Sequence, residues 1–153
     1  MNYSFDTSAL TKVYHHELGS RRAIEIFNEK GAIIRISNLA IVEVQSAFAM
    51  KVRTGIINQQ WADWNMNRVF DDLAINRLSV NELNQSHMDC ARSLVAKYGY
   101  TRRLRTLDAL QLAVALDLHR RGLTEVFVVA DKLLVEVAIA EGLAAENPEV
   151  NEQ

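Results

Sequence analysis

The stretch EVFVVADKLLVEVAIAE, residues 125–141, decides the architecture of this chain. Residues 125–130 are rich in β-branched and aromatic side chains and predict a strand. Asp131 follows this run, and the apolar pattern of residues 132–141 predicts a helix. Strands that alternate with helices are typical of parallel sheets with helical crossovers, so we expect an α/β fold with a helix-covered sheet.

The same alternation extends through the whole chain. Further strands are predicted at residues 3–5, 32–36, 76–79 and 143–145. Further helices are predicted at residues 7–17, 20–30, 39–54, 58–74, 82–98 and 106–121. The last of these is apolar nearly all round, which indicates a central, buried helix. Thr7 or Ser8 is the expected N-cap of the first helix.

Six glycines follow stretches with helical patterns, where a left-handed residue commonly ends a helix. They are Gly19, Gly31, Gly55, Gly99, Gly122 and Gly142. No linker-like stretch divides the sequence, so we predict one domain over residues 1–147 and a polar tail over residues 148–153.

The composition narrows the class of protein. The chain has 153 residues, of which 49% are hydrophobic and 24% are charged, as in globular domains. The net charge of −2 gives no overall attraction to nucleic acid. Cys90 is the only cysteine, so no intrachain disulfide forms. The start MNYSFD does not resemble a signal peptide and no apolar segment is long enough to span a membrane, so we expect a cytoplasmic protein.

Four acidic residues stand in apolar surroundings. Asp6 and Asp131 each end an apolar run, Glu43 is the only charge in LAIVEVQSAFAM (39–50), and Asp108 is the only charge in LDALQLAVAL (107–116). A carboxylate in such surroundings is costly unless it is paired or holds a metal. Ligands of parallel sheets gather outside the carboxyl ends of the strands, where we expect Asp6 and Asp131. Asp108 lies at the start of its helix, and Glu43 lies about one turn into its helix, where its longer side chain can reach the same edge.

Four neighbouring carboxylates repel one another, and Mg²⁺ or Mn²⁺ removes this conflict. Such an ion also activates water and neutralises charge on a phosphate, so the pattern predicts metal-dependent phosphoryl transfer. The sequence has no His or Cys cluster that suggests zinc. Each acid also has a purely structural alternative, because Asp6 and Asp131 could be N-caps and Glu43 a partly exposed helix residue.

Four motifs resemble those of the PIN domain family. They are FDTSALTKVY (5–14), LAIVEV (39–44), LRTLDALQLAVAL (104–116) and VFVVADKLLVEVA (126–138). The most similar variety is the toxin ribonuclease of bacterial VapBC toxin–antitoxin pairs. This resemblance implies a three-layer α/β/α sandwich with a central, mostly parallel sheet.

The resemblance also implies an Mg²⁺- or Mn²⁺-dependent endoribonuclease. Its metal-binding and catalytic acids fall on Asp6, Glu43, Asp108 and Asp131, and a hydroxyl that helps to place the metal or its water falls on Ser8. In similar proteins an antitoxin inserts a basic side chain into the acidic pocket, and the toxin is often a homodimer.

A basic cluster precedes Asp108. Arg102, Arg103 and Arg105 could hold the RNA backbone beside the metal, since arginine matches phosphate geometry, or they could form a solvated loop. Trp61 and Trp64 are expected to pack against the core or at a subunit interface, with base stacking as the alternative.

Two other functions remain open at the level of the sequence. A phosphatase similar to the haloacid dehalogenases could use Asp6 as its nucleophile, but such enzymes need a second acid where this chain has Ser8. A non-catalytic PIN domain that only binds RNA or a protein partner is the other alternative. Cleavage of labelled RNA with and without a chelator separates these possibilities.

Overall fold

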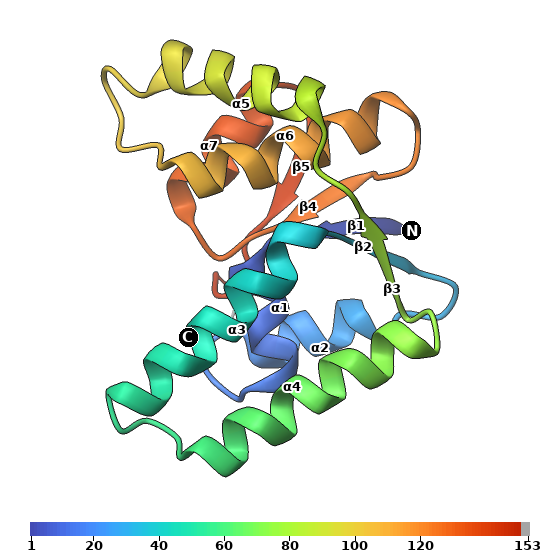
Figure 1. Cartoon of the computed structure of the whole chain (residues 1–153). Coiled ribbons are helices and arrows are strands. Elements are labelled where there is room, and N and C mark those ends of the chain that lie inside the picture. The colour runs from blue at the N-terminus through green and yellow to red at the C-terminus, as the bar shows by residue number, and fades with distance from the viewer. Residues whose placement is uncertain (151–153) are drawn as a thin grey trace.

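A parallel sheet forms the centre of the computed structural model, which describes residues 1–150 (Figure 1). Its strands are β1 (Asn2–Phe5), β2 (Ile33–Ser37), β3 (Leu78–Asn81), β4 (Val126–Val128) and β5 (Ala144–Glu146). They lie in the order β3-β2-β1-β4-β5, and each neighbouring pair is parallel. The order reverses between β1 and β4, and ligands of open parallel sheets bind at such a point.

Helices cover both faces of this sheet. They are α1 (Thr7–Tyr14), α2 (Ser20–Phe27), α3 (Asn38–Arg53), α4 (Gln59–Ala74), α5 (Gln85–Tyr98), α6 (Thr106–Arg120) and α7 (Lys132–Ala140). Figure 1 shows α1 to α4 on one side and α5 to α7 on the other. The predicted three-layer α/β/α sandwich is therefore confirmed.

Each face of the sheet has its own hydrophobic core, because successive strand residues point to opposite faces. Phe127 packs into the core beneath α5, α6 and α7, whereas Val128 packs into the core formed with α1 to α4. Helix α6 is buried along most of its length, as its apolar sequence predicts. The two cores fix the sheet from both sides and thereby fix the loops at its carboxyl edge.

The structure corrects several local predictions. The N-cap of α1 is Asp6, not Thr7 or Ser8, and its carboxylate accepts a hydrogen bond from the backbone of Ala9. Strand β4 ends at Val128, so Asp131 does not directly follow a strand. Gly99 has a right-handed backbone with φ −67°, and Gly19 precedes α2 as its N-cap with φ 85°.

The prediction that the two tryptophans of α4 face the core is wrong, and their packing at a subunit interface stays a prediction. Trp61 and Trp64 are 55% and 51% exposed, and their rings meet edge to face with centroids 5.3 Å apart. The buried face of α4 is formed instead by residues that include Ala62, Met66 and Val69.

The end of the chain packs against the domain as far as it is described. Pro148 is buried, and Glu149 forms an ion pair with Lys12 at 2.7 Å. The predicted tail covers residues 148–153, of which 151–153 lie outside the described residues. No helix in the described part of the chain combines the length and apolar character that crossing a membrane requires.

Candidate active site

One cavity brings the four predicted acids together. It has a volume of about 770 Å³, and its lining includes Asp6, Glu43, Asp108 and Asp131. These residues come from the start of α1, from α3, from the first turn of α6 and from the start of α7. The cavity therefore lies at the carboxyl edge of the sheet, where the strand order reverses.

Asp6 is the most deeply buried of the four acids, with 5% of its surface exposed. Its Oδ1 accepts hydrogen bonds from the hydroxyl of Ser8 at 2.6 Å and from the backbone N–H of Ala9 at 2.9 Å. The Ser8 oxygen accepts in turn from the backbone N–H of Ala130 at 2.9 Å. The position of Asp6 is thus fixed by its own helix and by the loop that follows β4.

Burial raises the pKa of Asp6 from 3.8 to about 7. The hydrogen bonds from Ser8 and Ala9 lower it, but the negative charges of Asp108 and Glu43 raise it further. The carboxylates are therefore close enough to repel one another. Without a cation, burial and the neighbouring carboxylates favour the protonated form of Asp6.

Glu43 is held by a residue that the sequence analysis did not single out. The side-chain amide of Gln111 donates to Glu43 Oε1 at 2.7 Å and to the hydroxyl oxygen of Thr7 at 3.0 Å. Its carbonyl oxygen accepts from the hydroxyl of Ser37 at 2.8 Å. Gln111 follows Asp108 by three residues on the same helix face, and this spacing was the available signal.

Asp108 and Asp131 complete the acidic lining. Oδ2 of Asp108 accepts from Nε of Arg105 at 3.1 Å, and Oδ1 of Asp131 caps α7 by accepting from the backbone N–H of Leu134 at 2.9 Å. The bond with Asp108 raises the pKa of Arg105, and the charges of Asp131 and Glu43 add to this effect. Arg105 therefore lies within the electrostatic reach of three of the four acids.

The chemistry of this cavity fits a hard divalent cation. Each acid uses one carboxylate oxygen in the bonds described above, and within residues 1–150 the other oxygen has no hydrogen-bond partner. An all-oxygen set of donors suits Mg²⁺ or Mn²⁺ better than zinc. Across the same residues, no three acidic, His or Cys side chains are grouped tightly enough to hold one ion together. In this structure the four carboxylates line one cavity but do not form a compact group of three ligands.

Comparison with known proteins places the chain in a family. A family model for the PIN domain matches residues 3–144. The chain belongs to the PIN domain family. The comparison with curated protein sequences gave no significant match.

Solved structures of other proteins share this PIN fold. VapBC2 from Rickettsia felis, solved with a promoter DNA fragment, superposes with a TM-score of 0.67 at 15% identity and covers 96% of this chain and 98% of that chain. VapC20 from Mycobacterium tuberculosis superposes with a TM-score of 0.64 at 14% identity, and the match covers 88% of this chain and 93% of VapC20. A chain of a toxin–antitoxin complex from Klebsiella pneumoniae superposes with a TM-score of 0.60 at 18% identity, and the match covers 95% of this chain and 97% of that chain.

The predicted arginine cluster of this PIN domain divides in two. Arg105 lines the cavity, whereas Arg102 and Arg103 do not. Arg102 instead forms an exposed ion pair with Glu136 at 3.2 Å. Of these three arginines, only Arg105 is therefore placed to contact a group bound inside the cavity.

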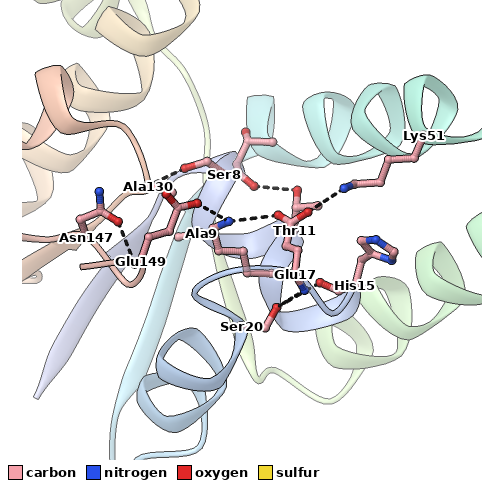
Figure 2. A network of polar contacts seen from close by, with 12 residues as sticks. Ser8, Ala9, Thr11, His15, Glu17, Ser20, Lys51, Ala130, Asn147 and Glu149 are labelled. Carbon is pink, nitrogen blue, oxygen red and sulfur yellow. Dashed lines mark hydrogen bonds and ion pairs between the residues drawn. The ribbon is translucent and has the colours of Figure 1, made fainter. Parts of the chain in front are cut away.

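A network of two buried lysines and two half-buried glutamates forms another part of the cavity wall (Figure 2). Glu17 accepts from Lys12 at 3.1 Å and from Lys51 at 2.6 Å, and Lys12 also pairs with Glu149. Burial alone raises the pKa of Glu17, but the bonds from Lys51 and Lys12 lower it below its ordinary value. Sequence reasoning missed this network because Lys51 and Glu149 are far from Lys12 and Glu17 in the chain.

Proposed function

We propose that this PIN domain is a divalent-metal-dependent endoribonuclease that hydrolyses RNA phosphodiester bonds. The observation that carries the proposal is the cavity at the reversal of the strand order, lined by acids from separate parts of the chain. Asp6, Glu43, Asp108 and Asp131 hold Mg²⁺ or Mn²⁺ in this proposal. The bound ion activates water and neutralises charge on the phosphate.

The protein's own contribution is to keep the acids in place before substrate arrives. Ser8 and the first turn of α1 hold Asp6, and the backbone of Leu134 holds Asp131. Gln111 holds Glu43. Preorganised groups lose little freedom when the ion and the phosphate bind, so more of the binding energy remains for the reaction.

Exposed positive groups that line the cavity support a phosphate-containing substrate. The side chain of Arg105 is 66% exposed, and the exposed Arg53 also lines the cavity. Arg102 and Arg103 precede Arg105 in the chain and can extend contact along an RNA backbone. These groups provide a local attraction that the net charge of −2 does not.

A role as the toxin of a type II toxin–antitoxin pair is part of the proposal. One structural neighbour is described as a sarcin–ricin loop cleaving toxin, and another was solved as a toxin–antitoxin complex. We propose by analogy a cognate antitoxin that places a basic side chain in the acidic cavity, a homodimeric toxin and a cytoplasmic location. The haloacid-dehalogenase-like alternative has lost its support, because the chain is a PIN domain and has Ser8 at the position of the second acid.

Cleavage of labelled RNA tests the function. Purified protein is expected to cut RNA internally with Mg²⁺ or Mn²⁺, to stop when EDTA is added, and to recover when the metal is restored in excess. Asp108→Asn should fold normally and lose at least 100-fold in rate, as removal of an essential electrostatic group commonly does. Cleavage that continues in EDTA, or full activity in Asp108→Asn, contradicts the proposal. RNA binding without any cleavage supports the non-catalytic alternative.

A further inference from the structure

Gln111 is the one polar residue in the otherwise apolar stretch of residues 109–116 in α6. Only 4% of its surface is exposed, and its buried neighbours on α6 include Leu112, Ala113 and Val114. An amide in such a place is costly unless it is hydrogen-bonded. Its bonds reach Thr7 on α1, Ser37 at the end of β2 and Glu43 on α3, so one side chain joins three segments around the acidic cavity.

Its partners fix the orientation of the Gln111 amide. The Ser37 oxygen accepts from the backbone N–H of Ala40 as the N-cap of α3, and its hydroxyl proton is donated to the Gln111 carbonyl. An ionised Glu43 can only accept hydrogen bonds. A flipped amide would bring two acceptor oxygens together at the distance of 2.7 Å that separates Gln111 and Glu43. The NH₂ group therefore faces Glu43, and the chain of donors runs from Ala40 through Ser37 and Gln111 to the carboxylate.

The hydrogen bond from Gln111 determines which carboxylate oxygen of Glu43 remains available to bind a metal ion. Oε1 is occupied by Gln111, and within the described residues Oε2 has no hydrogen-bond partner. A free glutamate side chain loses rotamer entropy worth on the order of 1–2 kcal/mol when it is ordered. Gln111 orders Glu43 before any ion arrives, so this loss does not weaken ion binding.

We propose that Gln111 is a positioning residue of the divalent-metal site and acts through Glu43. The inference rests on the proposed metal-dependent function. Loss of a partner that orients a metal ligand typically weakens metal binding by about 10- to 100-fold. Gln111 touches neither the ion nor the substrate in this role, so its effect must disappear when Glu43 can no longer serve as an anionic ligand.

A double-mutant cycle on Mn²⁺ affinity, measured by the EPR signal of the free ion, tests this role. Gln111→Met keeps the length of the side chain but cannot donate to Glu43, and we expect about 10- to 100-fold weaker Mn²⁺ binding. Gln45→Met on the exposed surface of α3 is the matched control and should bind like the wild type. In a Glu43→Gln background, Gln111→Met should change the affinity by less than about twofold, because non-additivity marks residues that act as a unit.

A second measurement keeps the inference testable if Gln111→Met does not fold. In the wild-type protein, the side-chain NH₂ resonances of Gln111 should shift as Mg²⁺ is added, with the same half-saturation as the Mg²⁺ affinity measured by calorimetry. Unchanged resonances at saturating Mg²⁺ overturn the inference. So does a Gln111→Met protein that binds Mn²⁺ like the wild type, or that loses affinity equally in the Glu43→Gln background.

The outcomes also separate this inference from the function on which it rests. A wild-type protein that binds Mn²⁺ but does not cut RNA overturns the ribonuclease proposal, and the Gln111 cycle still decides the positioning role. A wild-type protein that binds neither Mn²⁺ nor Mg²⁺ overturns both.

Discussion

Ser8 and Asp6 form a hydrogen bond of 2.6 Å at the edge of the sheet, with the Ser8 hydroxyl donating to the carboxylate. The same hydroxyl oxygen accepts from the backbone N–H of Ala130, directly before Asp131. Ser8 therefore links the end of β1 to the loop after β4, the two strands between which the order reverses. This link holds the two acids that follow these strands in one cavity.

Removal of the Ser8 hydroxyl should destabilise the fold. In Ser8→Ala, the N–H of Ala130 loses its acceptor and Asp6 loses a donor, so we expect the free energy of unfolding to fall by about 1–3 kcal/mol. Ser93→Ala is the control, because Ser93 is exposed and its hydroxyl bonds only a carbonyl of its own helix. Its expected cost is within about 0.5 kcal/mol. Urea unfolding measures both, and equal costs contradict the linking role of Ser8.

Asp6 should make the metal-free protein less stable as the pH rises. Its folded-state pKa of about 7 lies above the ordinary value of 3.8, so between these values the folded state keeps a proton that the unfolded state has released. The stability that this proton contributes is complete below pH 4 and is lost as the pH rises through 7. The slope is at most about 1.4 kcal/mol per pH unit.

Asp6→Asn removes this titration and keeps the oxygen that accepts from Ser8 and Ala9. In EDTA the variant should therefore gain stability relative to the wild type between pH 4 and 7. Asp63→Asn, on the exposed face of α4, should follow the wild type. Urea unfolding at several pH values tests this, and parallel curves for Asp6→Asn and the wild type contradict the shifted pKa.

Arg105 should have opposite effects on metal and on RNA. Its ion pair with Asp108 competes with a bound cation, so Arg105→Gln should tighten Mn²⁺ binding. The side chain is 66% exposed, and such pairs contribute only about 0.2–1 kcal/mol, which corresponds to at most about fivefold in affinity. The same change should weaken RNA binding in EDTA, measured by fluorescence anisotropy, because a phosphate contact is lost.

Arg103→Gln is the control for the effect on metal binding. Arg103 is exposed and, among residues 1–150, forms no ion pair. The Arg103→Gln variant should therefore bind Mn²⁺ with the affinity of the wild type. A decrease in Mn²⁺ affinity in Arg105→Gln contradicts the competition that we infer.

The two glutamates that pair with the buried lysines should contribute unequally to the stability of the fold. Glu17→Gln leaves both Lys12 and Lys51 with a weakened partner, whereas Glu149→Gln affects Lys12 alone. The lysine side chains are 6% and 11% exposed, so an unpaired ammonium is costly there. We expect losses of about 2 kcal/mol for Glu17→Gln and about 1 kcal/mol for Glu149→Gln in urea unfolding. The reverse order contradicts the bridging role of Glu17.

The sequence predicted the layers and the acidic edge because both depend on local patterns. The β-branched run of β4 and the apolar sequence of α6 indicate buried elements before any contact is known. Asp6 and Asp131 stand at transitions from strand to helix, and such transitions share one edge in a parallel sheet. The structure places all four acids on one cavity, and their catalytic role remains the proposal made above.

The sequence could not show the contacts that hold this edge together. Gln111 meets Glu43 across 68 residues of sequence and Thr7 across 104, and its spacing of three from Asp108 places it near the acids without indicating these partners. The pairing of Lys12 with Glu149 depends on how the end of the chain packs. Trp61 and Trp64 were misplaced because the apolar pattern of α4 does not show which of its apolar residues face the sheet.

A crystal of the wild-type protein soaked in Mn²⁺ tests the central claim most directly. Anomalous scattering locates the ion without assumptions about its ligands. The account predicts a peak inside the acidic cavity at coordinating distance from carboxylate oxygens of Asp6 and at least one of Glu43, Asp108 and Asp131, and its loss in Asp6→Asn. A peak only elsewhere on the protein, or an undiminished peak in Asp6→Asn, contradicts the claim that these acids form one metal site.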